Sequence, residues 1–134
     1  MSAYEPRDVA WDVAQAMAAD PDMVAAGIGV GATMVPYDLE DRLPFVVVQV
    51  LGGVVTDRVV DAARINIDTW AATPSEATRA ALTAFGAAMR LSDRGDAFRG
   101  DTTVYARPYP ITDDAHPTLA HVRALVGVTT VSER

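Results

Sequence analysis

The sequence predicts an α+β domain with a mostly antiparallel five-stranded sheet, two helices packed on one face, and the element order α-β-β-β-α-β-β. Residues 45–51 are nearly continuous in β-branched side chains, and residues 63–71 alternate between apolar and polar, which is typical of two strands. Thr73-Pro74-Ser75-Glu76 follows at once as a capping box, with proline at the first helical position. Short connections between elements favour antiparallel pairing.

The N-terminal third predicts a helix, a strand and a loop. Residues 6–19 place apolar side chains at helical spacing, and Ala19-Asp20-Pro21-Asp22 ends that helix. Residues 24–35 are apolar and broken by glycine, which we interpret as a first strand that contains bulges. Residues 36–44 are an acidic loop.

The remaining elements follow from the pattern after residue 44. Residues 52–61 form a long connection between the strands at 45–51 and 63–71. The capped helix runs to about residue 91 and turns one face to the core, made of Ala81, Leu82, Phe85, Ala88 and Met89. Residues 91–101 are charged and glycine-broken and are expected to be a mobile loop. The last two strands are expected at 102–109 and 119–131, with a turn region at 110–117.

The composition limits the class of protein. A chain of 134 residues, half of them hydrophobic, is the size of one domain, here residues 1–134, with its own core. The chain has no cysteine, which excludes a disulfide framework, a thiolate nucleophile and Cys-ligated zinc. A net charge of −7 without a basic patch is atypical of a free-standing nucleic-acid-binding domain. No apolar run approaches the ~20 residues that cross a membrane, and the first residues do not form a secretory signal.

No pattern in the sequence indicates catalysis, a metal or a cofactor. His116 and His121, near Asp113 and Asp114, lack any recognised metal-ligand spacing, and we interpret them as residues of a solvated loop. The glycine run at 27–31 lacks the context of a dinucleotide site or a P-loop. The acidic residues at 38–41 lack the spacing of a calcium loop. We therefore expect no enzyme activity and no cofactor.

One sheet face would remain uncovered by the two helices. Alternation along the strands places a mixture of aromatic, arginine and other polar residues there: Gln49, Arg64, Asn66, Asp68, Trp70, Tyr105, Arg107, Tyr109, His121 and Arg123. Aromatic and arginine side chains are enriched in the cores of protein interfaces. A solvated sheet face explains the same pattern equally well.

The stretch from residue 43 to 77 resembles a known family. Leu43-Pro44-Phe45-Val46-Val47-Val48 enters a strand, followed by Gly52-Gly53 and Thr56-Asp57; then Ile65, Ile67, Asp68 and Trp70 close the next strand before the helix at Glu76-Ala77. With a late strand at 120–131, this order resembles the tail terminator (tail completion) proteins of long-tailed bacteriophages, especially those of actinobacterial hosts. These motifs determine shape and include no catalytic signature.

The resemblance implies a structural virion protein. It would form a ring, usually hexameric, at the head-proximal end of the tail tube, assembled in the host cytoplasm, where it stops polymerisation and joins the head. Its partners would be further copies of itself, the major tail protein and head–tail connector or neck proteins, with DNA passing through the lumen and no membrane involved. The expected subunit-interface residues are Trp11, Arg64, Trp70, Tyr105, Arg107 and Arg123. Loops contacting the tube would carry Gly53, Asp57, Arg58, Arg94 and Arg99.

Two alternatives remain open from the sequence. Other head–tail connector or neck proteins share much of this fold. A small ligand-binding or enzymatic α+β domain of bacterial origin is a further possibility, which a stable monomer with a deep apolar pocket would favour.

Overall fold

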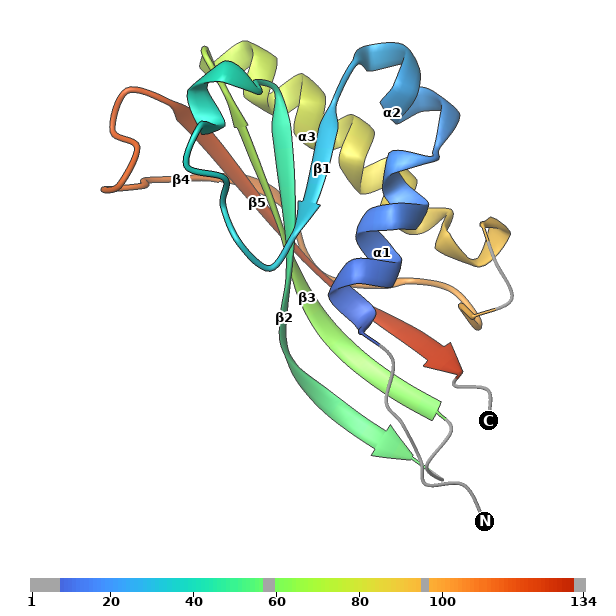
Figure 1. Cartoon of the computed structure of the whole chain (residues 1–134). Helices are drawn as coiled ribbons and strands as arrows, with labels where there is room; N and C mark the ends of the chain where they lie inside the picture. The colour runs from blue at the N-terminus through green and yellow to red at the C-terminus, as the bar shows by residue number, and fades with distance from the viewer. Residues whose placement is uncertain (1–7, 57–59, 95–96, 132–134) are drawn as a thin grey trace.

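The computed structural model describes residues 8–56, 60–94 and 97–131, and across these residues one five-stranded sheet is covered by helices on one face (Figure 1). The strands lie in the order β1-β2-β3-β5-β4. Their bounds are β1 Gly29–Ala32, β2 Phe45–Thr56, β3 Val60–Ala71, β4 Thr103–Ile111 and β5 Ala120–Val131. The α-helices are α1 Val9–Ala18, α2 Pro21–Ala26 and α3 Pro74–Met89, and short 3₁₀ turns lie at Leu39–Asp41 and Leu91–Asp93.

The predicted α+β class and five-stranded sheet are confirmed, but the sheet is mixed. β1 runs parallel to β2, whereas the β2–β3, β3–β5 and β5–β4 pairs are antiparallel. A helix, α2, separates α1 from β1, so residues 24–26 belong to that helix and not to the first strand. Asp20 explains the difference, because its side chain accepts from the Asp22 N–H and caps α2, with Pro21 at the first helical position.

The glycine run at 27–31 has two structural uses. Gly27 ends α2 in the left-handed conformation, at φ 67°. Gly29 and Gly31 lie in β1 beside Phe45 of the neighbouring strand, and a Cβ at Gly29 would come within 2.7 Å of the Phe45 ring. The glycines therefore make room for an aromatic ring that packs across the β1–β2 pair.

The expected long loop at 52–61 is wrong, because β2 and β3 form one continuous hairpin. The two strands pair from Phe45↔Trp70 to Thr56↔Val60, with a bulge between Val50 and Gly52. Gly53, expected in a tube-contacting loop, lies within β2; Asp57 and Arg58 lie outside the described residues. A bulge admits glycine into a strand, so an apolar pattern interrupted by glycine is compatible with a continuous strand as well as with a loop.

Helix α3 begins as predicted, since the Thr73 hydroxyl accepts from the Glu76 N–H at 3.2 Å. The predicted core face is only partly right. Leu82 and Met89 are exposed, and the buried face consists of alanines: Ala77, Ala80, Ala81, Ala84, Ala87 and Ala88. The small alanine side chains let the helix axis lie close to the sheet.

The main core fills the space between the helices and the sheet. It combines the apolar side of α1 with the helix-facing residues of the strands, among them Val13, Met17, Val46, Ile65 and Ile67. A bidentate ion pair closes its rim: Arg90 Nε and Nη2 donate to the two carboxylate oxygens of Asp20 at 3.0 and 2.9 Å. This pair joins the end of α3 to the start of α2.

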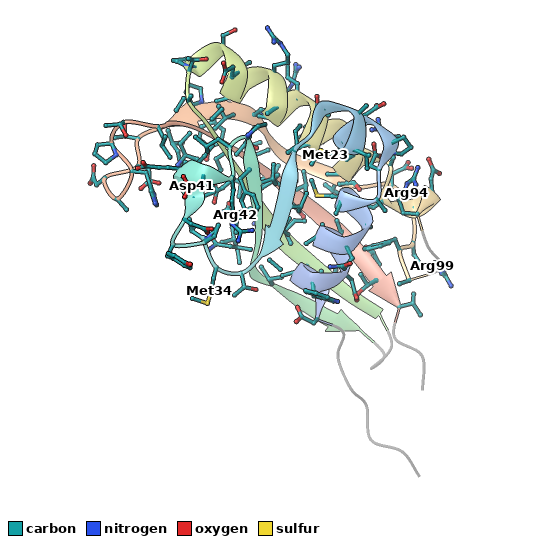
Figure 2. All side chains as sticks on the ribbon, turned by 45° about the horizontal axis from the view of Figure 1, so that its top comes forward. Met23, Met34, Asp41, Arg42, Arg94 and Arg99 are labelled. Carbon is teal, nitrogen blue, oxygen red and sulfur yellow. The ribbon has the colours of Figure 1, made fainter. Side chains whose placement is uncertain are left out.

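Two apolar residues of the segment expected as a mobile loop at 91–101 pack into the protein. Leu91 and Phe98 are buried, and Phe98 forms a bridge with Thr130 near the end of β5. Arg94 and Arg99 are exposed. Figure 2 shows both on the opposite side of the molecule from Met34, which lies in the segment after β1.

Candidate functional site

The outer face, defined as the sheet face turned away from the helices, has a covered part and an open part. Residues 33–44 and 112–119 cover the end of the sheet that carries Trp70. Phe45, Val47 and Trp70 form a second apolar cluster there with Leu39, and Val35, Leu43 and Leu119 pack against it. The sequence predicted that the whole of this face is exposed. In the structure, residues 33–44 and 112–119 cover one end of it.

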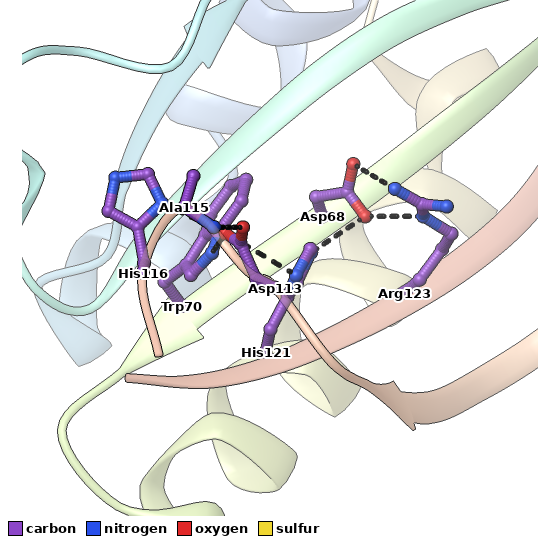
Figure 3. A network of polar contacts seen from close by, with 7 residues as sticks. All are labelled: Asp68, Trp70, Asp113, Ala115, His116, His121 and Arg123. Carbon is purple, nitrogen blue, oxygen red and sulfur yellow. Dashed lines mark hydrogen bonds and ion pairs between the residues drawn. The ribbon is translucent and has the colours of Figure 1, made fainter. Parts of the chain in front are cut away.

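Trp70 is at the centre of the covered part (Figure 3). Its indole stacks on the His121 ring, with centroids 4.2 Å apart and planes inclined by 22°. Its Nε1–H donates to Asp113 Oδ2 at 2.9 Å, and His116 Nδ1 lies 2.9 Å from the same oxygen. Trp70 is only 3% exposed. The expectation that Trp70 projects from a free surface is therefore wrong, because Asp113 holds the 112–119 segment over it.

Asp68 forms a second centre in the same network (Figure 3). Arg123 Nε donates to Asp68 Oδ1 at 2.7 Å, and His121 Nε2 lies 3.0 Å from that oxygen. Burial disfavours the charged carboxylate, but the hydrogen bonds from His121 and Arg123 outweigh it and hold the pKa of Asp68 below its ordinary value. The register Asp68↔Arg123 and Trp70↔His121 places these side chains side by side across β3 and β5.

The same balance applies to Asp113. Burial raises its pKa, while hydrogen bonds from His116, Trp70 and the Ala115 N–H lower it, with a net decrease. The interpretation of His116 and His121 as solvated is wrong, because His121 is buried and His116 is half-buried. The sequence did not reveal that two aspartates far apart along the chain each contact one histidine. Asp113 contacts His116, and Asp68 contacts His121.

The covered part borders a hollow of about 450 Å³, with Gln49, Asp68, Asp113 and Arg123 in its lining. Among the described residues, no group of three or more His, Cys, Asp or Glu side chains could hold a metal ion. No hydrogen bond in the described part of the chain joins either imidazole to a Ser or Thr hydroxyl. The visible effect of the network is to fix the 112–119 segment to the sheet.

The open part of the outer face presents an arginine–aromatic pair. The Arg64 guanidinium lies 4.4 Å from the centroid of the Tyr105 ring, and both side chains are exposed. The Tyr105 ring lies against Gly127, where a Cβ would approach within 2.8 Å of it. Glycine on β5 therefore lets the ring lie across the sheet between β4 and β3.

The other expected interface residues are dispersed. Arg107 is exposed on β4, and Arg123 is half-buried in its ion pair with Asp68. Trp11 is 55% exposed on α1, in the helix layer on the other side of the sheet. The structure thus brings Arg64 and Tyr105 together and leaves Trp11 as a separate surface.

Comparison with solved structures finds several similar chains. No protein-family model matches the chain, and no curated protein sequence matches it. A chain of the solved structure described as "Virion of native gene transfer agent (GTA) particle" aligns with 90% of this chain and 92% of its own length, at 14% identity and a TM-score of 0.46. A TM-score below 0.5 does not establish a shared fold. Within the described residues, no helix combines the length and apolar character needed to cross a membrane.

Proposed function

We propose that this chain is a structural virion protein of the tail terminator type. In this role it forms a ring on the finished tail tube, stops further addition of the major tail protein and provides the surface that joins the head. The proposal rests on the resemblance carried by residues 43–77 and 120–131. The structural observation that supports it best is the exposed Arg64–Tyr105 pair on the open part of the outer face.

This pair has the chemistry of an interface core. Arginine and tyrosine are enriched there, since each combines a large contact area with directional polar groups. A cyclic ring needs two different patches on each subunit, because its contacts are heterologous. The open outer face, with Arg64, Tyr105 and Arg107, supplies one patch, and Trp11 on α1 lies in the other layer of the molecule and supplies a second.

Other features of the chain suit binding to the remaining partners of a tail terminator. Arg94 and Arg99 are exposed on the segment after α3, where they can contact acidic groups of the major tail protein. A net charge of −7 suits a lumen through which DNA slides without being bound. Head–tail connector or neck proteins would take the opposite side of the ring.

Two other functions have specific support. Another neck protein would use the same exposed pair for a ring at a neighbouring level of the virion. A ligand-binding domain is favoured by the hollow beside Asp68 and His121, which is lined by charged side chains.

Immunogold labelling of virions separates a terminator or other neck protein from a ligand-binding domain. Antibody against this chain should label one position per particle, at the junction of head and tail. Label distributed along the tail, or particles that carry none of the protein, would contradict the proposal. Label at the junction also disfavours the ligand-binding domain, which has no reason to be in the particle.

A further inference from the structure

The two edges of the sheet differ in how they are closed. β1 pairs with β2 only at residues 45–48. Beyond Val48, no strand in the described part of the chain pairs with that side of β2. Figure 1 shows the β2–β3 hairpin continuing well past the end of β1. At the other edge of the sheet lies β4.

The backbone direction identifies the open groups on β2. The carbonyls of Pro44 and Val48 accept from Gly29 N and Thr33 N, so both point to the β1 side. Because backbone groups alternate along a strand, the N–H and C=O of Val50 point to the same side, past the end of β1. An edge with unpaired backbone groups is a template for an additional strand.

Side chains on this edge are exposed and apolar. Val50 is 45% exposed and Leu51 is 56% exposed. Neither contains a charge, and no proline interrupts β2. The bulge between Val50 and Gly52 is the feature of this edge that opposes strand addition, so an added strand must itself be irregular at the matching position. An added strand would pair with the free backbone groups of this edge and cover its exposed apolar side chains.

The chain itself carries a matching strand at its other edge. β4 contains Pro108 and Pro110, which cannot donate a backbone hydrogen bond, so its free edge can pair only along residues 103–107. That half of β4 also exposes apolar side chains, with Val104 at 39% and Tyr105 at 51%.

We propose that a second copy of this chain adds residues 103–107 of its β4 to residues 49–53 of β2, joining the sheets head to tail. This inference rests on the self-assembly in the proposed function and gives the ring a strand–strand contact in addition to the patches around Arg64 and Trp11. Three successive antiparallel pairs, β2–β3, β3–β5 and β5–β4, make β4 run opposite to β2. Copies placed side by side therefore pair antiparallel, and the same heterologous contact can repeat around a ring.

Two structural features limit which residues of β2 and β4 can pair between copies. β1 blocks β2 before residue 49, and Pro108 ends the usable part of β4. Both free segments carry an irregularity, β2 between Val50 and Gly52 and β4 between Val104 and Ala106. The alignment that sets these irregularities against each other places Gln49 opposite Arg107 and Leu51 opposite Tyr105. Directly opposed residues in an antiparallel pair have Cβ atoms about 4.5–5.5 Å apart, close to what a disulfide spans.

Disulfide trapping tests this contact, since the natural chain has no cysteine. The double variant Leu51→Cys/Tyr105→Cys is oxidised both alone and on isolated tail tubes, then separated on a non-reducing denaturing gel. We expect a ladder at multiples of 14.2 kDa that collapses on reduction. Each single variant should run as a monomer. Both positions are more than half exposed, so the variants keep the fold, which far-ultraviolet circular dichroism checks.

The matched control is Leu51→Cys/Leu82→Cys, because Leu82 is 51% exposed on α3, away from both edges. A comparable ladder from this control would overturn the inference. A covalent dimer from Leu51→Cys alone would also overturn it, because two β2 edges would then pair about a two-fold axis.

Native mass measurement of the wild type distinguishes the two proposals. Wild-type oligomers without a ladder from either Leu51→Cys/Tyr105→Cys or the second opposed pair, Gln49→Cys/Arg107→Cys, which keeps Tyr105, would reject the edge contact and leave the ring in place. A wild type that stays monomeric both alone and with tail tubes would reject both.

Discussion

At the residue scale, the bidentate contact between Arg90 and Asp20 joins the end of α3 to the start of α2. The Asp20 side chain is 1% exposed and also caps α2. Asp20→Asn keeps the cap, because asparagine caps as well as aspartate, but it removes the charge. We expect the free energy of unfolding to fall by about 1.5–3 kcal/mol, as for hydrogen bonds to charged groups. Urea denaturation measures the change.

Asp22 supplies the control, since it contacts the same Arg90 at 3.2 Å but is 71% exposed. Asp22→Asn should change the free energy of unfolding by no more than about 0.5 kcal/mol. Similar losses in both variants would show that the ion pair does not depend on burial.

The effect of Asp20→Asn should depend on pH. The Arg90 hydrogen bonds lower the pKa of Asp20 in the folded protein. A lowered folded pKa contributes stability that is present above the unfolded pKa of about 3.9 and is lost as the pH falls through the folded pKa. The difference in unfolding free energy between wild type and variant should therefore be full at pH 6 and shrink below about pH 4. A difference that grows on acidification would contradict the assignment.

Substitution of Trp70 should affect mainly the stability of the fold, and substitution of Tyr105 mainly the assembly of the ring. Trp70 is buried under the 112–119 segment, so Trp70→Ala should cost about 3–5 kcal/mol of unfolding free energy, comparable to truncation of Ile67 in the main core. Tyr105→Ala removes an exposed ring and should cost less than about 1 kcal/mol, yet weaken subunit association. Thermal unfolding and native mass measurement read out the two effects. A large stability loss for Tyr105→Ala would remove it from the interface.

At the element scale, the β2–β3 hairpin depends on its two glycines. Gly52 and Gly53 have φ of +143° and +156°, which other residues rarely adopt. A Cβ at Gly52 meets nothing nearby, whereas one at Gly53 would collide with the Ala62 carbonyl. Gly52→Ala should cost about 1–3 kcal/mol from strain alone, and Gly53→Ala clearly more. Equal losses, measured by denaturant unfolding, would show that the bulge relaxes at both positions.

The sequence predicted the elements best where local chemistry determines them. The Thr73 cap, the β-branched run at 45–50 and the alternation at 63–71 each specify a helix start or a strand without help from the rest of the chain. The hairpin beyond Gly52 was not predictable in this way, because pairing with β3 outweighs the low strand propensity of glycine. The short helix α2 was not predicted, because Asp20 and Pro21 mark the end of one helix and the same two residues also begin the next.

The candidate site was less predictable than the fold. Alternation placed Asp68, Trp70, His121 and Arg123 correctly on one face, since that depends only on strand register. It could not reveal that Asp113, many residues away, holds the 112–119 segment over Trp70. Which part of a sheet face is exposed depends on long-range contacts of loops, and no local pattern encodes those.

At the scale of the whole molecule, several exposed surfaces suit the proposed assembly. The outer face is covered at one end and open at the other, and both edges of the sheet expose apolar side chains. A ring would bury these surfaces and leave the acidic charge of the chain to the lumen and the exterior.

Deletion of the gene for this chain tests the central claim most directly, with electron microscopy of the resulting lysate. Without a terminator, growth of the tail tube has no stop and the head has no surface to join. We therefore predict tails of abnormal, dispersed length and heads that are full but unattached, with normal virions restored by a plasmid copy of the wild-type gene. Tails of normal length joined to heads in the deletion lysate would contradict the proposed function.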